Sequence, residues 1–344
     1  MAAALALSTA APADTFAIKQ LPDLPAPHGF AGAFAGIHRG HLLAGGGTNF
    51  PDSVMPWLGG KKVWHDRLFV LDLVAAEAGW RAAGRLPEPN GYGVSLTAEE
   101  GVLLVGGGDA ERCSDKVRLL TLDATGSPVF RNLPALPAPR AQMCGALVGR
   151  TVHVCGGIAR PDSPAAAADH WALDLDRELD GWRVLPQLPG PGRILATAAA
   201  CDDAFFVLGG CSLAPDPQGK PARTYLREAW KFVGGKWSRL AAPPRAAAAA
   251  ASPAPVVGHG VFLVSGDDGL QAGLATPAEH RGFTPEILRY DVARDAWEAA
   301  GRLRVPPPVT LPVVPWRNGF IFVNGEIRPG VRSPQVFSLV PDRR

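Results

Sequence analysis

The chain has 344 residues and a formal charge of only +2, and its 34 Lys and Arg are scattered, so it lacks the basic surface that nucleic-acid binding needs. Its hydrophobic residues, 47% of the total, are interrupted by 40 Gly and 34 Pro, a composition typical of many short strands joined by turns. We therefore expect an all-β protein that binds neither nucleic acid nor a membrane, since no later segment has about 18 consecutive apolar residues.

The N-terminal residues "MAAALALSTAAPADT" form an Ala-rich apolar stretch that ends in small residues. This pattern is typical of the apolar part and cleavage site of a secretory signal, with "APA" before Asp14 as the cut, but a basic start is missing. We expect residues 1–13 to be a signal-peptide remnant or a disordered end, and residues 14–344 to form one domain. The expected location is periplasmic or secreted, with a cytoplasmic location as the alternative.

Apolar strands that end in a glycine pair recur along the chain, as in "LAGGG", "LVGGG", "VCGGI" and "VLGGC". The residues taken to follow these strand ends lie 50 to 61 positions apart: Gly47, Gly108, Ile158, Cys211, Asp267 and Glu326. A second series, of aromatic residues, keeps step with the first: Phe16, Trp80, Phe130, Trp182, Trp237 and Trp297. A period near 50 with these two features is the kelch signature, in which each repeat forms one four-stranded blade. The sequence therefore predicts a six-bladed kelch β-propeller.

The aromatic series begins before the glycine series, and no outer aromatic strand follows Glu326 in the 18 residues that remain. The sixth blade therefore lacks an outer strand, which only the N-terminus can supply. We expect the segment from Phe16 to Leu21 to pair beside residues 335–339 and to close the last blade. Closure of this kind removes the exposed strand edges of an open sheet.

The residue types give no support for a metal site. The five cysteines are odd in number and lack metal-type spacing. A copper-radical oxidase on the same fold would need two Tyr, two His and a Cys that converge, and the spacing of Tyr92, Tyr225 and Tyr290 predicts no such set.

Carboxylates mark the expected ligand site, because propellers bind ligands in the central funnel. Asp267 and Glu326 directly follow their strand ends, and Asp109 lies one residue past the equivalent position. Position alone leaves two roles open for Glu326, namely a ligand contact or a structural ion pair with Arg328 or Arg332.

Four segments together resemble the N-acetylneuraminate epimerase family of kelch proteins, the sialic acid mutarotases. They are "NGEIRPGVR" (324–332), "PHGFAGAFAGI" (27–37), "GGKKVWHD" (59–66) and "GYGVSL" (91–96). In members with the more familiar order, the counterparts of the first two segments lie on one continuous stretch, whereas here one lies near the end of the chain and the other near its start. The resemblance therefore points to a cyclically permuted branch.

The resemblance implies a mutarotase that interconverts the α and β anomers of N-acetylneuraminate by general acid/base ring opening and re-closure. The family's proposed proton acceptor and its arginine partner carry over onto Glu326 and Arg332. A carboxylate can act first as base and then as acid, while a guanidinium can hold the sugar carboxylate through two parallel hydrogen bonds. No metal or organic cofactor is required, the implied partner is a small acidic sugar, and protein partners are not indicated.

The long stretch 48–66 could roof the funnel, or it could pack Trp57 and Trp64 against the first blade. Tyr92 and Asp109 could equally be a core tyrosine and a turn aspartate. The candidate substrate-binding residues are Asn324, Asn49, Lys62, Tyr92, Asp109 and Asp267. Two alternatives stay open: an enzyme for a different acidic sugar, and a non-catalytic kelch module that binds a glycan or protein.

Overall fold

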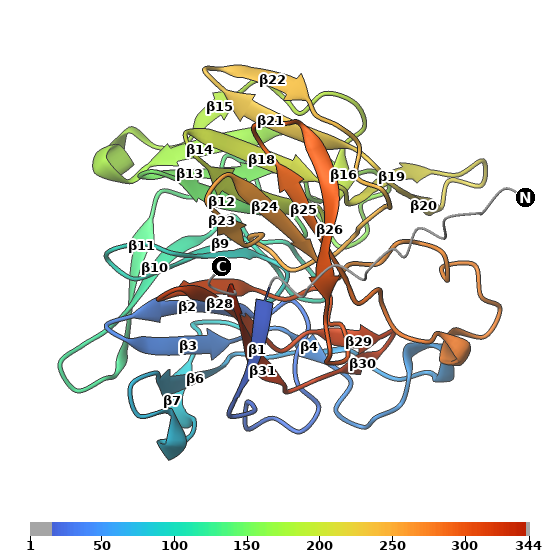
Figure 1. Ribbon diagram of the computed structural model, residues 1–344. Helices are drawn as coiled ribbons and strands as arrows, with labels where there is room; N and C mark the ends of the chain where they lie inside the picture. Colours follow the sequence, from blue (N-terminus) through green and yellow to red (C-terminus); the bar gives the residue numbers. More distant parts are fainter. Residues whose placement is uncertain (1–15, 342–344) are drawn as a thin grey trace, which may run out of the picture.

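The computed structural model describes residues 16–341, so the expectation for residues 1–13 lies outside the described residues. Within this range the chain forms six four-stranded antiparallel sheets, which we call blades 1 to 6 (Figure 1). Blades 1 to 3 comprise, in order, Phe34–His38 (β2), His41–Gly45 (β3), Arg67–Asp72 (β6), Arg81–Arg85 (β7); Val94–Thr97 (β8), Val102–Val105 (β9), Val117–Leu122 (β10), Pro128–Leu133 (β11); and Cys144–Val148 (β12), Thr151–Cys155 (β13), His170–Asp174 (β14), Arg183–Leu185 (β15). Blades 4 to 6 comprise Thr197–Cys201 (β17), Ala204–Leu208 (β18), Ala229–Val233 (β21), Lys236–Arg239 (β22); Val256–Val257 (β23), Gly260–Val264 (β24), Glu286–Asp291 (β25), Ala296–Arg302 (β26); and Val313–Trp316 (β27), Gly319–Val323 (β28), Val336–Pro341 (β31), Phe16–Leu21 (β1).

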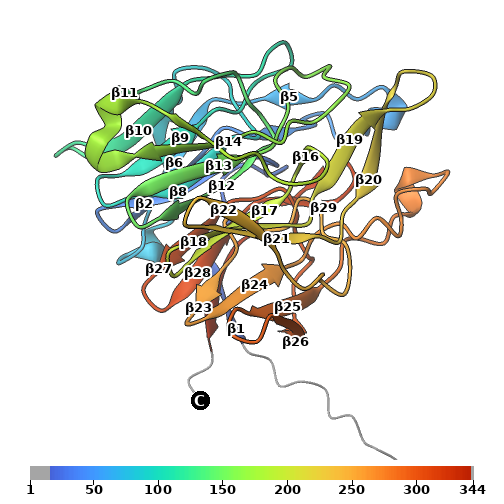
Figure 2. The same cartoon turned by 90° about the horizontal axis from the view of Figure 1, so that it is seen from above.

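Smaller elements lie on the connections between these strands. They are a three-stranded sheet of Arg193–Ile194 (β16), Cys211–Pro215 (β19) and Pro221–Tyr225 (β20); the pairs Thr48–Asn49 (β4) with Val63–Trp64 (β5) and Glu326–Arg328 (β29) with Val331–Arg332 (β30); and the 3-10 helices Pro56–Leu58 (η1), Ala76–Ala78 (η2), Leu175–Asp180 (η3) and Pro277–Glu279 (η4). The β19–β20 hairpin projects beyond the blades (Figure 2). Among residues 16–341, no helix combines the length and apolarity needed to cross a bilayer.

The second strand of each blade is almost entirely buried. The sequence AFFVL of β18 and VLLV of β9 are buried along their whole length. Such runs do not alternate because both faces of the strand pack against neighbouring blades. The fourth strands of blades 1, 3 and 4 are mostly exposed, so the core lies toward the inner strands.

Six residues form a closed circle of backbone hydrogen bonds at the centre of the molecule. Each N–H donates to the carbonyl of the preceding member, over 2.6 to 3.0 Å, and Gly32 donates to Thr310, so the circle returns to its start. Each member has a positive φ of 54° to 65°: Gly32, Tyr92, Gln142, Leu195, Ala249 and Thr310. One residue from each of six successive repeats therefore meets at a common axis.

The N-terminal and C-terminal segments lie together in blade 6. Strand β1 pairs antiparallel with β31, from Phe16 opposite Pro341 to Leu21 opposite Val336 (Figure 1). The expected pairing of the N-terminal strand is thus present, although its partner strand runs two residues beyond the expected 335–339.

The tryptophans of the aromatic series tie neighbouring blades together. Each indole N–H donates over 2.8 Å to a carbonyl near the outer strand of the preceding blade, in the pairs Trp80 to Pro22, Trp182 to Pro134, Trp237 to Pro186 and Trp297 to Ala241. Their role is structural, and it includes a specific hydrogen bond as well as packing.

The glycine pairs correspond to two successive residues with positive φ in each repeat. In the first repeat these residues are Gly46 and Gly47, at 67° and 81°. The residue that follows is therefore Thr48, which bridges to Ala31 as its equivalents do in other repeats, and the assignment of Gly47 to this position was wrong by one residue. Asn324 takes the first place of the pair in blade 6 at 63°, a conformation that Asn tolerates better than most residues.

Candidate functional site

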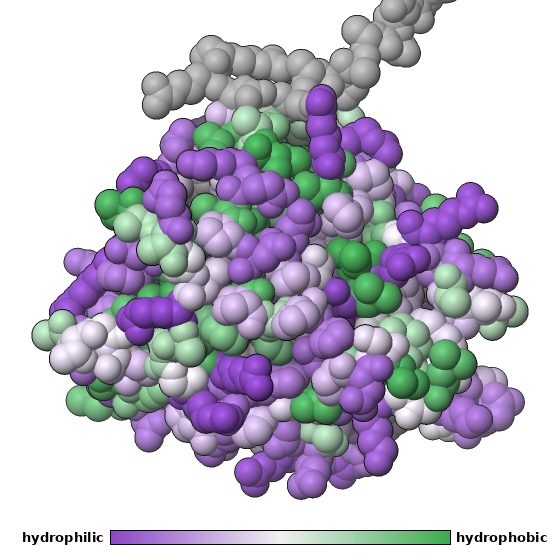
Figure 3. Space-filling model, turned by 90° about the horizontal axis from the view of Figure 1, so that it is seen from below, coloured by the Kyte–Doolittle hydropathy of each residue, from purple (hydrophilic) through white to green (hydrophobic). Residues whose placement is uncertain are grey.

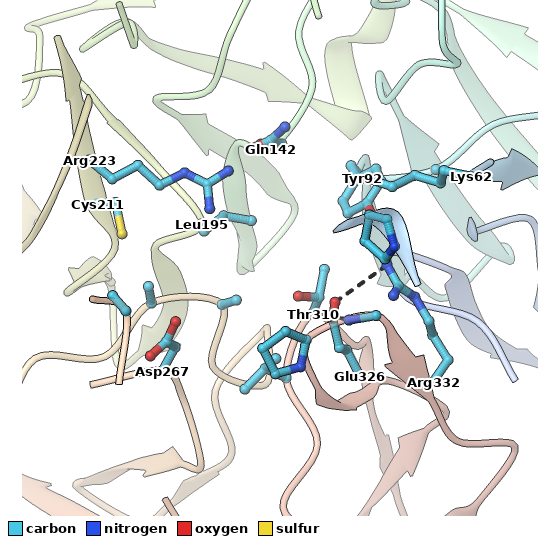
Figure 4. Close-up of a pocket in the computed structure, with 18 of the residues that line it drawn as sticks. Lys62, Tyr92, Gln142, Leu195, Cys211, Arg223, Asp267, Thr310, Glu326 and Arg332 are labelled. Atoms are coloured by element: carbon cyan, nitrogen blue, oxygen red, sulfur yellow. Dashed lines mark hydrogen bonds and ion pairs between the residues drawn. The ribbon is translucent and has the colours of Figure 1, made fainter. Parts of the chain in front are cut away.

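An open cavity of about 850 Å³ lies over the hydrogen-bonded circle (Figure 4). Five circle residues line it, namely Tyr92, Gln142, Leu195, Ala249 and Thr310. Its volume suits a small ligand, and a few polar groups stand in a largely apolar lining. This cavity is the funnel in which the sequence analysis expected a site.

Glu326 stands in the wall of this cavity at the start of β29. Its backbone exchanges two hydrogen bonds of 2.9 Å with Val309, which fixes the main chain. One carboxylate oxygen, Oε1, accepts a hydrogen bond of 2.8 Å from the N–H of Gly330, in the turn that leads to β30. The side chain is 19% exposed, so the hairpin holds the carboxylate in place while leaving it accessible.

Arg332 lies opposite Glu326 in the same hairpin, with its Nη2 3.5 Å from Glu326 Oε2. The arginine side chain is only 4% exposed, and its guanidinium covers the ring of Phe50 with Cζ 4.7 Å from the centroid. Its Nε and Nη1 atoms are buried and have no hydrogen-bond partner among the described residues. The guanidinium thus faces Glu326 from a largely buried position in the cavity wall.

The two segments that carry the family resemblance at opposite ends of the chain meet behind this carboxylate. The N–H of Gly325 donates to the carbonyl of Phe30 over 2.9 Å. A Cβ added to Gly29 would lie 2.2 Å from the backbone of Ser333, so the main chains touch here. Residues 27–37 therefore support the position of the Glu326 hairpin.

Lys62 and Tyr92 line the cavity, as expected. The Lys62 ammonium lies 5.5 Å from the ring centroids of both Trp64 and Tyr92, within cation–π range. The Tyr92 hydroxyl pairs with Thr48 Oγ1 at 3.0 Å. Both side chains stand on the same side of the cavity as Arg332 (Figure 4).

Asp109 and Asp267 also line the cavity, but protein groups engage both. Asp109 Oδ1 accepts the backbone N–H groups of Glu111 and Arg112, so it stabilises its own turn. Asp267 Oδ1 accepts the N–H of Gly269, and Oδ2 accepts the Tyr225 hydroxyl at 2.7 Å.

Asn49 and Asn324, which the sequence analysis selected as sugar-binding residues, are not among the residues that line the cavity. Asn49 is buried, donates to the carbonyl of Gly29 and pairs with His65 at 2.7 Å. Asn324 is 1% exposed and serves as the left-handed residue of its repeat. Both are structural residues beneath the site.

The sequence analysis missed polar residues on the far wall, chiefly Arg223 and Tyr225 of β20. This hairpin is the counterpart of the β4–β5 and β29–β30 pairs of other repeats, and because these connections differ in length, the repeat gave no register for it. Its sequence "APDPQGKPARTY" contains the Asp-Pro and Gly residues that mark a turn, which was the available signal.

Two cavity thiols offer no nucleophile at neutral pH, because burial raises the pKa of Cys113 to about 11 and that of Cys211 to about 12. Residues 16–341 hold no group of three or more His, Cys, Asp and Glu side chains arranged to bind a metal. The charged and polar side chains of the lining, Glu326 and the arginines among them, are therefore the groups through which this cavity can bind a ligand or move a proton.

The fold and cavity define an all-β protein of four-stranded antiparallel blades around a ligand-sized funnel. A family model described as N-acetylneuraminate epimerase matches residues 6–127. The solved "Structure of YjhT" aligns with 92% of this chain and 95% of its own, with a TM-score of 0.68 and 16% identity, which shows a shared kelch-propeller fold. These comparisons relate the chain to the kelch-type N-acetylneuraminate epimerases.

Curated relatives match part of the chain. The N-acetylneuraminate epimerase of Haemophilus influenzae strain PittEE is 38% identical over 119 residues, which cover 30% of this chain and 31% of that protein. The enzyme of that name from Yersinia pestis strain Pestoides F is 39% identical over 90 residues, covering 24% and 22%. The match thus spans less than a third of these relatives, and the Glu326 hairpin lies outside residues 6–127.

Proposed function

We propose that this protein is a sugar mutarotase of the N-acetylneuraminate epimerase family that interconverts the α and β anomers of N-acetylneuraminate. The observation that carries the proposal is Glu326, a carboxylate in the cavity wall that a backbone N–H and a buried guanidinium hold in place. The family match to residues 6–127 supports it independently, because those residues include the segment packed against the Glu326 hairpin.

We also assign the chain to the cyclically permuted branch of that family. The segments 27–37 and 324–332 stand far apart in the sequence and in contact in space, through Gly325 and Phe30. In the more familiar chain order these two segments would be continuous, and their contact here is the arrangement that a permutation would preserve.

The reaction requires one proton to move from the anomeric hydroxyl to the ring oxygen. Glu326 Oε2 is the oxygen available to take it, since Oε1 is occupied by the Gly330 N–H and the 3.5 Å contact with Arg332 is longer than a strong hydrogen bond. As the hydroxyl loses its proton, the C2 carbonyl forms, the bond from C2 to the ring oxygen breaks, and that oxygen is protonated. Rotation and re-addition to the other carbonyl face return the second anomer and restore the carboxylate.

The test is nuclear magnetic resonance of freshly released α-N-acetylneuraminate, with and without protein. We expect faster approach to the β anomer, and a catalysed rate about 10² to 10⁴ lower for Glu326→Gln, because glutamine keeps the size of glutamate but takes up no proton. Glu99→Gln is the matched control, since this side chain is 90% exposed. A rate equal to the spontaneous one with the unaltered protein rejects the proposal.

A non-catalytic glycan-binding module is the second candidate. Trp57 lines the cavity and is 37% exposed, as an indole ring that stacks on a sugar would be. On the face shown in Figure 3, apolar residues form separate groups among polar ones, which argues against a broad protein-binding surface there. Sugar binding without any acceleration of anomer exchange would favour this candidate.

Export to the periplasm or the exterior, with residues 14–344 as one domain, remains part of the proposal. Cell fractionation and N-terminal sequencing of the mature protein test it directly. A mature chain that begins near Asp14 in the exported fraction is expected, and an intact N-terminus in the cytoplasmic fraction contradicts it.

A further inference from the structure

The β19–β20 hairpin presents one face to the cavity. In β20, Arg223 and Tyr225 are two residues apart, so their side chains lie on the same face of the strand, and both line the cavity. Arg223 pairs with Leu213 and Tyr225 with Cys211 across the hairpin. The strand register thus directs an arginine into the funnel (Figure 4).

Tyr225 anchors this hairpin to the next blade. Its hydroxyl donates to Asp267 over 2.7 Å, and Asp267 bridges to Ala248 beside the circle. The ring packs so closely on Gly269 that an added Cβ there would lie 2.7 Å from it. The base of the hairpin is therefore fixed on both sides, and the Arg223 side chain starts from a defined position.

The positively charged side chains of the cavity wall differ in the contacts that they make with other residues of the protein. Arg332 is buried against Phe50 and faces Glu326. Lys62 is exposed, but its ammonium lies over two aromatic rings. Arg223 is exposed and makes no hydrogen bond or ion pair with another residue of the described part of the chain. Its planar donor set is free to bind a carboxylate through two parallel bonds.

We propose that Arg223 binds the carboxylate of the acidic sugar from the wall opposite Glu326. This inference rests on the proposed function. The carboxylate and the anomeric oxygen are attached to the same carbon atom, so two protein groups facing each other across the funnel can hold one and deprotonate the other. Arg332 then acts through Glu326 and does not contact the sugar carboxylate.

The test measures binding of a carboxylated analogue that cannot be turned over, 2-deoxy-2,3-didehydro-N-acetylneuraminate, by isothermal titration calorimetry. Arg223→Gln should weaken binding about 10- to 100-fold, the scale of charge-assisted hydrogen bonds, and Arg223→Lys should recover part of the loss. The methyl ester of the analogue should bind equally to the unaltered protein and to Arg223→Gln. Lys220→Gln removes a charge from the same hairpin outside the cavity and should change neither affinity.

Three results would overturn the assignment: unchanged affinity in Arg223→Gln, loss of affinity confined to Lys62→Gln, or no binding of the analogue by the unaltered protein. The outcome for the proposed function is separate. Binding that depends on Arg223, with no acceleration of anomer exchange, supports the subsite and rejects the mutarotase. Accelerated exchange with the same KM in Arg223→Gln supports the mutarotase and rejects the subsite.

Discussion

Phe16 packs edge-to-face against Phe262, with ring centroids 4.8 Å apart and ring planes at 84°. Phe16 begins the outer strand of blade 6, whereas Phe262 lies in β24 of blade 5. The Phe16 side chain is 6% exposed and belongs to a buried cluster that both blades share. The N-terminal strand therefore contributes to the core between two blades as well as to its own sheet.

Removal of residues 1–21 should lower the thermal unfolding temperature sharply, because β31 would lose its partner and blade 5 would lose Phe16. Phe16→Ala alone should cost about 3 kcal/mol in the free energy of unfolding, the usual scale for a buried phenylalanine. Urea unfolding measures this, with Lys19→Ala on an exposed position of the same strand as the control, expected within about 0.5 kcal/mol. Unaltered stability after the deletion would mean that blade 6 holds without an outer strand.

Arg332→Gln should lower kcat about 10- to 100-fold while KM changes little. The reason is that the guanidinium contacts Glu326 and is buried, so its loss misplaces the carboxylate more than it weakens sugar binding. Arg328→Gln, on an exposed position of the same hairpin, is the control and should leave both constants unchanged. A raised KM with unchanged kcat would show that Arg332 binds the sugar directly, as the family resemblance implies.

Asn324→Gly should leave the fold and activity intact, since Asn324 occupies the place that glycine takes in four other repeats. Both polar atoms of its amide are buried and lack a hydrogen-bond partner among the described residues, so glycine loses no contact of that kind. Asn324→Val should destabilise by about 1 to 3 kcal/mol, because a β-branched residue is strained at a φ of 63°. Chemical unfolding of the two variants makes the comparison. Loss of sugar affinity in a stable Asn324→Gly protein would show that Asn324 contributes to sugar binding.

Stability should fall between pH 7 and pH 5 because of a buried histidine pair. His153 Nδ1 and His170 Nε2 lie 2.9 Å apart, and burial lowers the pKa of His153 to about 4 and that of His170 to about 3. In the unfolded chain these histidines take up protons near pH 6.5, whereas in the native state they stay neutral at that pH. The stability that the neutral pair contributes is therefore complete above pH 6.5 and declines as the pH falls toward 4.

Each such histidine contributes up to about 1.4 kcal/mol per pH unit to the change of the unfolding free energy with pH. His170→Asn removes one titrating ring and should flatten the pH dependence of the unfolding free energy, whatever its effect at pH 7. His259→Asn is the control, since that side chain is 69% exposed and should leave the slope unaltered. An identical slope in His170→Asn would assign the pH dependence to other groups.

Repetition made the fold predictable, because four glycine pairs, their Ser-Gly and Asn-Gly counterparts and six aromatic residues at one period leave few arrangements open. The same repetition located Glu326, since a carboxylate stood where other repeats have small or apolar residues. It failed at Thr48, where three successive glycines allow two alignments. The period also does not specify the direction of the Asn49 side chain, which pairs with His65.

Arg223 was missed for a different reason. Its hairpin begins at the repeat position Cys211, as β4 and β29 begin at theirs, but these hairpins differ in length, so the period does not place Arg223 relative to the axis. Only the strand register and the Tyr225–Asp267 contact direct it inward, and both depend on the folded arrangement of neighbouring blades.

The circle of six backbone hydrogen bonds also affects the electrostatics of the funnel floor. In a helix, peptide dipoles point along one axis and sum to partial charges at the two ends. In this circle the donors run head to tail around the axis, so the components of their dipoles within the plane of the circle cancel. Discrimination between an acidic and a neutral sugar then depends chiefly on the charged side chains of the walls, which can change by substitution without altering the hydrogen bonds of the circle beneath them.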